Sequence, residues 1–332
     1  MAARPRGRLV AGFLCAGVAC LLLLTGIDQG GRADGVPPDT APGTEVARTP
    51  PDGAEAWPAG QQGVSLEDYD LNAASATRWE LPARLREISG LAMTADHRLL
   101  AHNDEVGVVF EIDYRDGSIV KEFQLADMAD PVAGDFEGIA VADGRIYVVT
   151  SSGRLYECPE GAAGQSVLFR VYATGVGRQC EIEGLAYDED ARELLLMCKD
   201  ARSQGLAGRL AVYRWSIDEK RLGAQATVVL PVGDLARRIG STRYQPSGIE
   251  RHPVSGNYFV VAARQGAIAE VTPAGEVLAA KRFTAARHRQ VEGIAFAADG
   301  ALIVADEGGG GRGTLTVYPG PGSVATNGRD AM

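Results

Sequence analysis

Three glutamates stand at the head of a short motif that recurs along this sequence. Glu137, Glu183 and Glu292 are each followed by Gly, then by Ile or Leu, and then by Ala. Ser89 and Ser247 hold the same place in two weaker copies of the motif. The five copies are separated by roughly 45 to 64 residues, and repeats of this length are typical of propeller blades, solenoids or arrays.

Equivalent positions of a circular repeat face a common axis, so we expect the three carboxylates to converge. Carboxylates held close together repel one another, which raises their pKa values unless a cation compensates. Ca²⁺ accepts six to eight oxygen ligands in irregular geometry. The sequence therefore predicts a Ca²⁺ site at Glu137, Glu183 and Glu292. The alternative is that each glutamate bonds backbone amides near its strand end, or lies solvated in a wet channel.

Five further residues form a candidate outer ring around this site. Ser89 and Ser247 hold the glutamate position itself, whereas Asp104, Asp306 and Glu307 follow their motifs by roughly 14 to 15 residues. Such residues could add metal ligands or bind a molecule above the metal. Each is also an ordinary polar turn residue, and that alternative stays open.

The elements around each motif are short strands separated by turn residues. In the second repeat they are Ile146 to Thr150, Arg154 to Glu157 and Val167 to Tyr172. Four antiparallel strands per repeat make a propeller blade. The last repeat supplies three strands, so we expect Thr77 to Leu81 to complete it and remove an exposed edge. The prediction is an all-β, five-bladed propeller over residues 65–320, followed by a flexible tail, 321–332.

The small residues of the motif have a structural explanation. Alternation along a strand puts Ile139 and Val141 on one face and Gly138 and Ala140 on the other. A large face packed on the small face of a neighbour suits blades that converge on a crowded axis. A longer interval before Ser247 predicts an inserted helix, with Asp234 as its N-cap and Gly240 as its stop.

The N-terminus has the features of a membrane anchor. A basic segment, 1–8, contains Arg4, Arg6 and Arg8 and precedes an uncharged run, 9–27, that is long enough to cross a bilayer. A cleaved signal peptide is the alternative. The Pro-rich segment 28–64 is predicted to be a disordered linker. This arrangement places the propeller on the periplasmic side of a bacterial inner membrane.

Composition and motifs argue against several other functions. The net charge of −10 disfavours nucleic acid as a partner and suits cations. The sequence contains no zinc-type histidine motif, no nucleophile elbow and no complete P-loop. Cys180 and Cys198 flank a predicted hairpin and are candidates for a disulfide, although cysteine partners cannot be deduced from sequence alone.

The sequence resembles the SdiA-regulated family of bacterial propeller proteins and is distantly similar to NHL-repeat propellers. The resemblance covers about Ser65 to Tyr318 and rests on five motifs in order: Glu87-Ile88-Ser89-Gly90-Leu91, Phe136-Glu137-Gly138-Ile139, Cys180-Glu181-Ile182-Glu183-Gly184-Leu185-Ala186-Tyr187, Pro246-Ser247-Gly248-Ile249 and Val291-Glu292-Gly293-Ile294-Ala295. It implies an N-terminal anchor, a five-bladed propeller and a calcium site, with no established biochemical activity. Thr150-Ser151-Ser152 and Ala263-Arg264 stand where the family tends to have acidic residues, so the outer ring departs from its pattern.

Three functions follow as hypotheses. The first is a Ca²⁺-bearing binding module that presents one face to a periplasmic ligand or protein. The second is a metal-dependent hydrolase of lactonase or phosphoesterase type, in which Asp306 or Glu307 would serve as the general base. The third is a purely structural propeller with an empty, wet channel.

Overall fold

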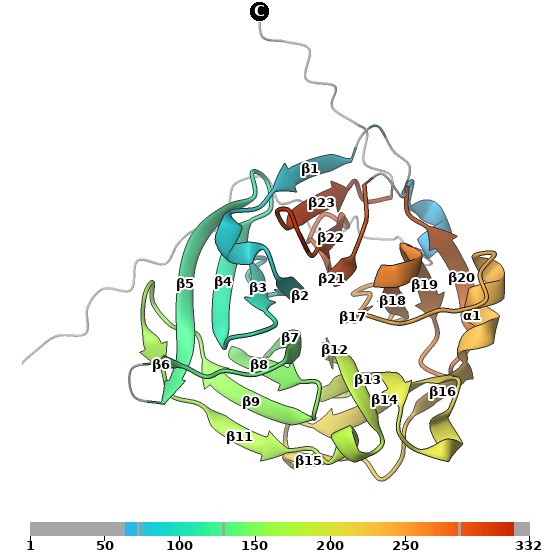
Figure 1. Cartoon of the computed structure of the whole chain (residues 1–332), viewed down its shortest axis with the longest axis horizontal. Coiled ribbons are helices and arrows are strands. Elements are labelled where there is room, and N and C mark those ends of the chain that lie inside the picture. The colour runs from blue at the N-terminus through green and yellow to red at the C-terminus, as the bar shows by residue number, and fades with distance from the viewer. Residues whose placement is uncertain (1–63, 72–73, 75, 128–129, 285–286, 322–332) are drawn as a thin grey trace, which may run out of the picture. The chain divides into compact units, whose positions relative to one another are not determined.

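Five β-sheets surround a central axis, and each sheet is one blade of a propeller (Figure 1). They belong to a computed structural model that describes residues 64–71, 74, 76–127, 130–284 and 287–321. The predicted all-β, five-bladed propeller is confirmed.

The predicted N-terminal features are outside this description. Segment 1–8, membrane span 9–27, nearly all of linker 28–64 and nearly all of tail 321–332 lie outside the described residues. Within the described part of the chain, every helix is too short or too polar to cross a membrane.

Each blade has a four-stranded core that starts at the axis and runs outward. Blade one contains β2 (Ile88–Met93), β3 (Leu99–Asn103), β4 (Val108–Asp113) and β5 (Ser118–Asp127). Blade two contains β7 (Phe136–Ala142), β8 (Arg145–Thr150), β9 (Arg154–Pro159) and β11 (Arg170–Ala173). Blade three contains β12 (Cys180–Asp188), β13 (Glu193–Ala201), β14 (Arg209–Ser216) and β16 (Val228–Pro231). Blade four contains β17 (Gly248–Arg251), β18 (Tyr258–Ala262), β19 (Ala267–Val271) and β20 (Val277–Arg282).

Blade five is completed by the N-terminal strand, as predicted. Its strands are β21 (Val291–Phe296), β22 (Leu302–Asp306), β23 (Thr314–Tyr318) and β1 (Thr77–Glu80). β1 pairs antiparallel with β23, with Thr77 opposite Val317 and Glu80 opposite Thr314. This pairing covers the β23 edge and closes the ring.

Short elements lie beside or between the main strands of the blades. They are β6 (Asp130–Pro131), β10 (Ser166–Val167), β15 (Arg221–Leu222) and the single-turn helices η1 (Leu66–Asp68), η2 (Ala83–Leu85), η3 (Val176–Arg178), η4 (Gln204–Leu206) and η5 (Ala263–Gln265). β6 and β10 both pair with β5, and β15 pairs with β14.

The inserted helix, α1 (Val232–Arg238), follows β16 but begins earlier than expected. Its N-cap is Pro231 and not Asp234, which lies in the first turn and forms an ion pair with Arg237. An acidic side chain in the first turn interacts favourably with the helix dipole. Asp234 therefore indicated the start of a helix correctly, but it did not mark the N-cap. Gly240 follows the helix with φ +62°, in agreement with its predicted role as the stop.

Motif glycines let the five inner strands approach one another around the axis. Each inner strand contacts the inner strands of both neighbouring blades. A Cβ on Gly138 would lie 2.5 Å from the Leu185 nitrogen, and one on Gly248 would lie 2.3 Å from the Glu292 carbonyl oxygen. A side chain at either position would strike the backbone of the next blade. The predicted packing of small faces on neighbouring blades is therefore confirmed.

The hydrophobic core is divided into five clusters, each between two adjacent blades. Tyr147 of blade two packs against Trp215 of blade three, for example, and Phe259 of blade four packs against Phe296 of blade five. The segment ahead of β1 fills the interface of blades four and five with four buried side chains: Val64, Leu66, Tyr69 and Leu71. Burial of apolar area between blades is therefore the main force that holds the ring together.

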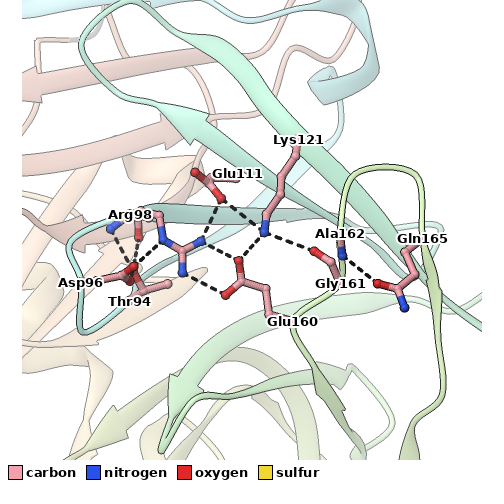
Figure 2. A network of polar contacts seen from close by, with 9 residues as sticks. All are labelled: Thr94, Asp96, Arg98, Glu111, Lys121, Glu160, Gly161, Ala162 and Gln165. Carbon is pink, nitrogen blue, oxygen red and sulfur yellow. Dashed lines mark hydrogen bonds and ion pairs between the residues drawn. The ribbon is translucent and has the colours of Figure 1, made fainter. Parts of the chain in front are cut away.

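Ion pairs clamp the outer parts of the same interfaces. Arg98 of blade one bonds Glu111 of its own blade, at 2.8 Å, and Glu160 of blade two, at 2.9 Å. Figure 2 shows both contacts. Lys121 forms an ion pair with Glu160 from the other side. Blades two and three share a comparable pair, Arg192 with Asp143 at 2.7 Å. Such partly exposed pairs contribute modestly to stability, but they fix the relative position of adjacent blades.

Candidate functional site

The glutamate position of the motif lies at a β-bulge or register shift in four blades, blade three included, where the pairing shifts between Ile182 and Leu185. The pairing of the first two strands shifts register between Phe136 and Gly138, and again between Val291 and Gly293. Glu137 and Glu292 are the extra residues at these shifts, and Ser89 is the equivalent residue in blade one. Bulges re-aim a side chain relative to the regular strand. Here they direct the ring residues toward the axis.

A small cavity lies on the axis at this level. Ser89, Glu137 and Glu292 line it together with the Gly-Leu or Gly-Ile pair of every blade. The space open to the centre of a water molecule is about 10 Å³, which is close to the room that one water needs. The cavity can therefore hold one water or one small ion, and it is too small for an organic substrate.

Glu183 supplies the third carboxylate, and it already has a cationic partner. Its side chain is buried and accepts a hydrogen bond from Nζ of Lys199, on the neighbouring strand β13. The Lys199 side chain is a quarter exposed. The ring of three carboxylates therefore contains one ammonium group of its own.

Burial raises the pKa of all three glutamates. The pKa of Glu137 rises to about 10 because of its burial and the nearby charges of Glu183 and Asp135. The pKa of Glu292 rises to about 8 through burial and the charge of Glu183. Burial also raises the pKa of Glu183, to about 7, although its hydrogen bond from Lys199 acts in the opposite direction. The three groups thus affect one another and behave as one acidic site.

Ser247 and Asp306 have structural partners instead of facing the axial cavity. Ser247 Oγ donates a hydrogen bond to the Val291 carbonyl, at 2.7 Å, and accepts one from the Ala263 amide, at 2.9 Å. Asp306 bonds the buried His288 ring at 2.6 Å. These two members of the candidate outer ring therefore stabilise the contacts of strand ends with neighbouring segments.

Asp104 and Glu307 form a different acidic group, between blades one and five. Burial, followed by the charges of Glu105 and Glu87, raises the pKa of Asp104. Burial, followed by the charges of Asp104 and Glu87, raises the pKa of Glu307. Only Ser89 of the candidate outer ring lines the axial cavity. The structure does not bring the five residues into one ring.

The donor atoms of the axial site suit a hard cation. Carboxylate and hydroxyl oxygens are the ligands that Ca²⁺ prefers. As the side chains lie, however, no three His, Cys, Asp or Glu residues within the described ranges are close enough together to hold a metal ion. Glu137 and Glu292 line the same cavity, whereas Glu183 is directed to Lys199, so binding would require the carboxylates to draw together.

Cys180 and Cys198 are joined by a disulfide between β12 and β13, with their Cα atoms 5.6 Å apart. The bond holds the strand that carries Glu183 to the strand that carries Lys199. Cys158 is a free, buried thiol, and burial raises its pKa to about 12.

Sequence reasoning missed the pairing of Glu183 with Lys199. The available signal was a lysine near the end of the second strand of its repeat, at the position where blades one and five carry Asp104 and Glu307. A basic residue at a position that is acidic in two other blades points to an internal counter-charge.

The sequence matches no protein-family model and no curated protein. Among solved structures, glutaminyl cyclase of Myxococcus xanthus is similar with a TM-score of 0.48 and 14% identity, over 73% of this chain and 95% of that chain. A luciferin-regenerating enzyme gives 0.47 and 12%, over 74% and 96%. A streptogramin B lyase gives 0.43 and 12%, over 73% and 97%. Similarity at this level carries no inference about activity, and the fold assignment rests on the five sheets themselves.

Proposed function

We propose that this protein is a non-catalytic binding module whose axial site binds Ca²⁺ through Glu137 and Glu292, with Glu183 as the third carboxylate. The observation that carries the proposal is the axial cavity, which has carboxylates on its wall and room for one ion. Three ionised carboxylates and one ammonium group sum to a charge of −2, which a divalent cation neutralises. The raised pKa values of Glu137 and Glu292 reflect the same excess of buried negative charge, because a buried acidic group that lacks a cation binds protons instead.

Two observations favour a binding module over a hydrolase. A metal-dependent hydrolase needs an open metal position with space for its substrate and a general base beside it. The axial cavity lacks that space. Asp306, one of the two candidate bases, is held by His288.

The proposed location follows from the N-terminal sequence. Arg4, Arg6 and Arg8 ahead of the uncharged run 9–27 favour an uncleaved anchor with the propeller on the periplasmic side of a bacterial inner membrane. The resemblance to the SdiA-regulated family supports the same arrangement. The proposed partner is a periplasmic ligand or protein that docks on one face of the propeller.

The test is a Ca²⁺ titration of the full chain in a non-ionic detergent, followed by calorimetry and by thermal unfolding with and without a chelator. We expect one bound Ca²⁺ per chain and a higher melting temperature with Ca²⁺. A ligand at one hundred times its Kd stabilises by about 2.7 kcal/mol. The Glu137→Gln variant should lose the effect. An unchanged melt and no bound Ca²⁺ would overturn the proposal.

A further inference from the structure

A cluster of aromatic side chains encloses a single lysine at the interface of blades two and three, away from the axial site. Lys220 lies in the turn between β14 and β15 of blade three. Its Nζ donates a hydrogen bond to the Tyr147 hydroxyl, at 3.2 Å, and lies 5.4 Å from the ring centre of Tyr147, 5.7 Å from that of Tyr172 and 5.4 Å from that of Trp215. Two of these rings come from blade two and one from blade three. We call the three rings and Glu157 the aromatic cage.

Glu157 gives the aromatic cage a negative charge. Its Oε2 accepts hydrogen bonds from Lys220 Nζ, at 3.0 Å, and from the Tyr172 hydroxyl, at 2.8 Å. Arg145 holds the other oxygen at 3.3 Å. Although burial raises the pKa of Glu157, the hydrogen bonds from Tyr172 and Lys220 hold that pKa below its ordinary value. The carboxylate is therefore ionised and fixed in place.

Two rings of the aromatic cage are fully buried, whereas its occupant is partly exposed. Tyr147 and Trp215 are each 1% exposed, but the Lys220 side chain is 32% exposed. β15 pairs with β14 through only two positions, Trp215 with Leu222 and Ser216 with Arg221. Lys220 also has φ +51°, a left-handed conformation that a lysine rarely adopts. Lys220 thus combines a left-handed backbone conformation with a side chain that reaches Glu157 and Tyr147.

Several aromatic faces around one carboxylate are the arrangement that proteins use to bind quaternary ammonium groups. We propose that the aromatic cage is a binding site for the trimethylammonium group of a small molecule, and that Lys220 is an internal competitor for it. A trimethylammonium group has no N–H, so it would contact the rings and pair with Glu157 by charge alone, and it would not replace the hydrogen bond that Lys220 donates to the Tyr147 hydroxyl. Lys220 would then turn out toward solvent with its hairpin, since its side chain is already 32% exposed.

Removing Lys220 should open the site. Glycine is the best replacement because it adopts positive φ without strain, so Lys220→Gly should keep the turn. Binding of tetramethylammonium and of choline is measured by calorimetry on the full chain. We expect Lys220→Gly to bind both at least about tenfold more tightly than the wild-type protein does, because the competitor is gone. Lys220→Asn tests the same loss of charge with a second residue that tolerates positive φ.

Two controls separate a cation site from a simple hole. 3,3-Dimethylbutanol has the shape of choline but no charge, and it should bind at least about tenfold more weakly. Lys121→Gly removes a comparable interface lysine that has one ring nearby, Phe123 at 5.9 Å, and it should gain no choline binding. The proposal is overturned if folded Lys220→Gly and Lys220→Asn show no saturable binding of either cation. Equal binding of choline and its neutral analogue would also overturn it.

Discussion

Lys199 donates a hydrogen bond from its ammonium group to the buried carboxylate of Glu183, beside the axis of the propeller. The contact joins β12 to β13, next to the disulfide of Cys180 and Cys198. An acidic ring that contains its own cation can be stable without a metal, and it can also discriminate among metals by charge. The balance between the internal ammonium group and an added cation is open to measurement.

Replacing Lys199 by glutamine should have two opposite effects. Without Ca²⁺, the variant should be less stable by about 1–2 kcal/mol, because the buried Glu183 loses its ion-pair partner. The expected loss is this small because the Lys199 side chain is only partly buried. The affinity of the variant for Ca²⁺ should rise roughly tenfold, since one repulsive charge is removed from the site. Urea unfolding and calorimetry measure the two quantities. Lys121→Gln removes an ion-paired lysine far from the axis and should lower stability with no change in Ca²⁺ affinity. An unchanged affinity in Lys199→Gln would show that Glu183 takes no part in binding.

Stability should fall as pH rises in the absence of Ca²⁺. Burial raises the pKa of Glu137 from an ordinary value near 4.5 to about 10, so between these pH values the folded state binds a proton that the unfolded state releases. Stability is then lost with increasing pH across this window. Glu137→Gln resembles the protonated residue, and its stability advantage over the wild-type protein should grow from near zero at about pH 5 to about 1–3 kcal/mol at about pH 9. Urea unfolding across this range checks it, and parallel pH profiles for the two proteins would contradict it.

The two serines of the repeated motif should behave differently. Ser247→Ala removes the two hydrogen bonds that join the Ser247 hydroxyl to the Val291 carbonyl and the Ala263 amide. The expected loss in the free energy of unfolding is about 1–3 kcal/mol. The affinity of this variant for Ca²⁺ should not change. Ser89→Ala alters the wall of the axial cavity, so it should weaken Ca²⁺ binding with about 0.5 kcal/mol or less of lost stability. Chemical unfolding and calorimetry of both variants distinguish them. The reverse pattern would mean that Ser247, and not Ser89, belongs to the site.

The sequence predicted the features of the fold that depend on local pattern. Motif glycines, alternating strands and the closing strand at Thr77 follow from residue types and spacing, and they are found where expected. The helix at Asp234 was predicted in kind but started earlier, because Asp234 lies within the first turn, where an acidic side chain interacts favourably with the helix dipole, and not at the N-cap.

Side-chain partners could not be predicted in the same way. Ser247 and Glu183 hold equivalent motif positions, yet one bonds the backbone of β21 and the other bonds a lysine of its own blade. Asp306 is directed to His288, a contact that depends on how the loop before β21 folds back. These choices depend on bulges and on registers between strands, which residue types alone do not specify.

The close approach of the inner strands gives the sharpest test of the ring itself. A methyl group on Gly138 would lie 2.5 Å from the Leu185 nitrogen in the next blade, so Gly138→Ala must push two inner strands apart. We expect a loss of about 2 kcal/mol or more in the free energy of unfolding. The same shift would move Glu137, the adjacent residue, and weaken Ca²⁺ binding at the axis. Gly205 has no atom within 4 Å of an added Cβ, so Gly205→Ala is the matched control and should cost less than about 0.5 kcal/mol. Equal stabilities for the two variants, measured by urea unfolding, would mean that blades two and three do not meet at the axis as described.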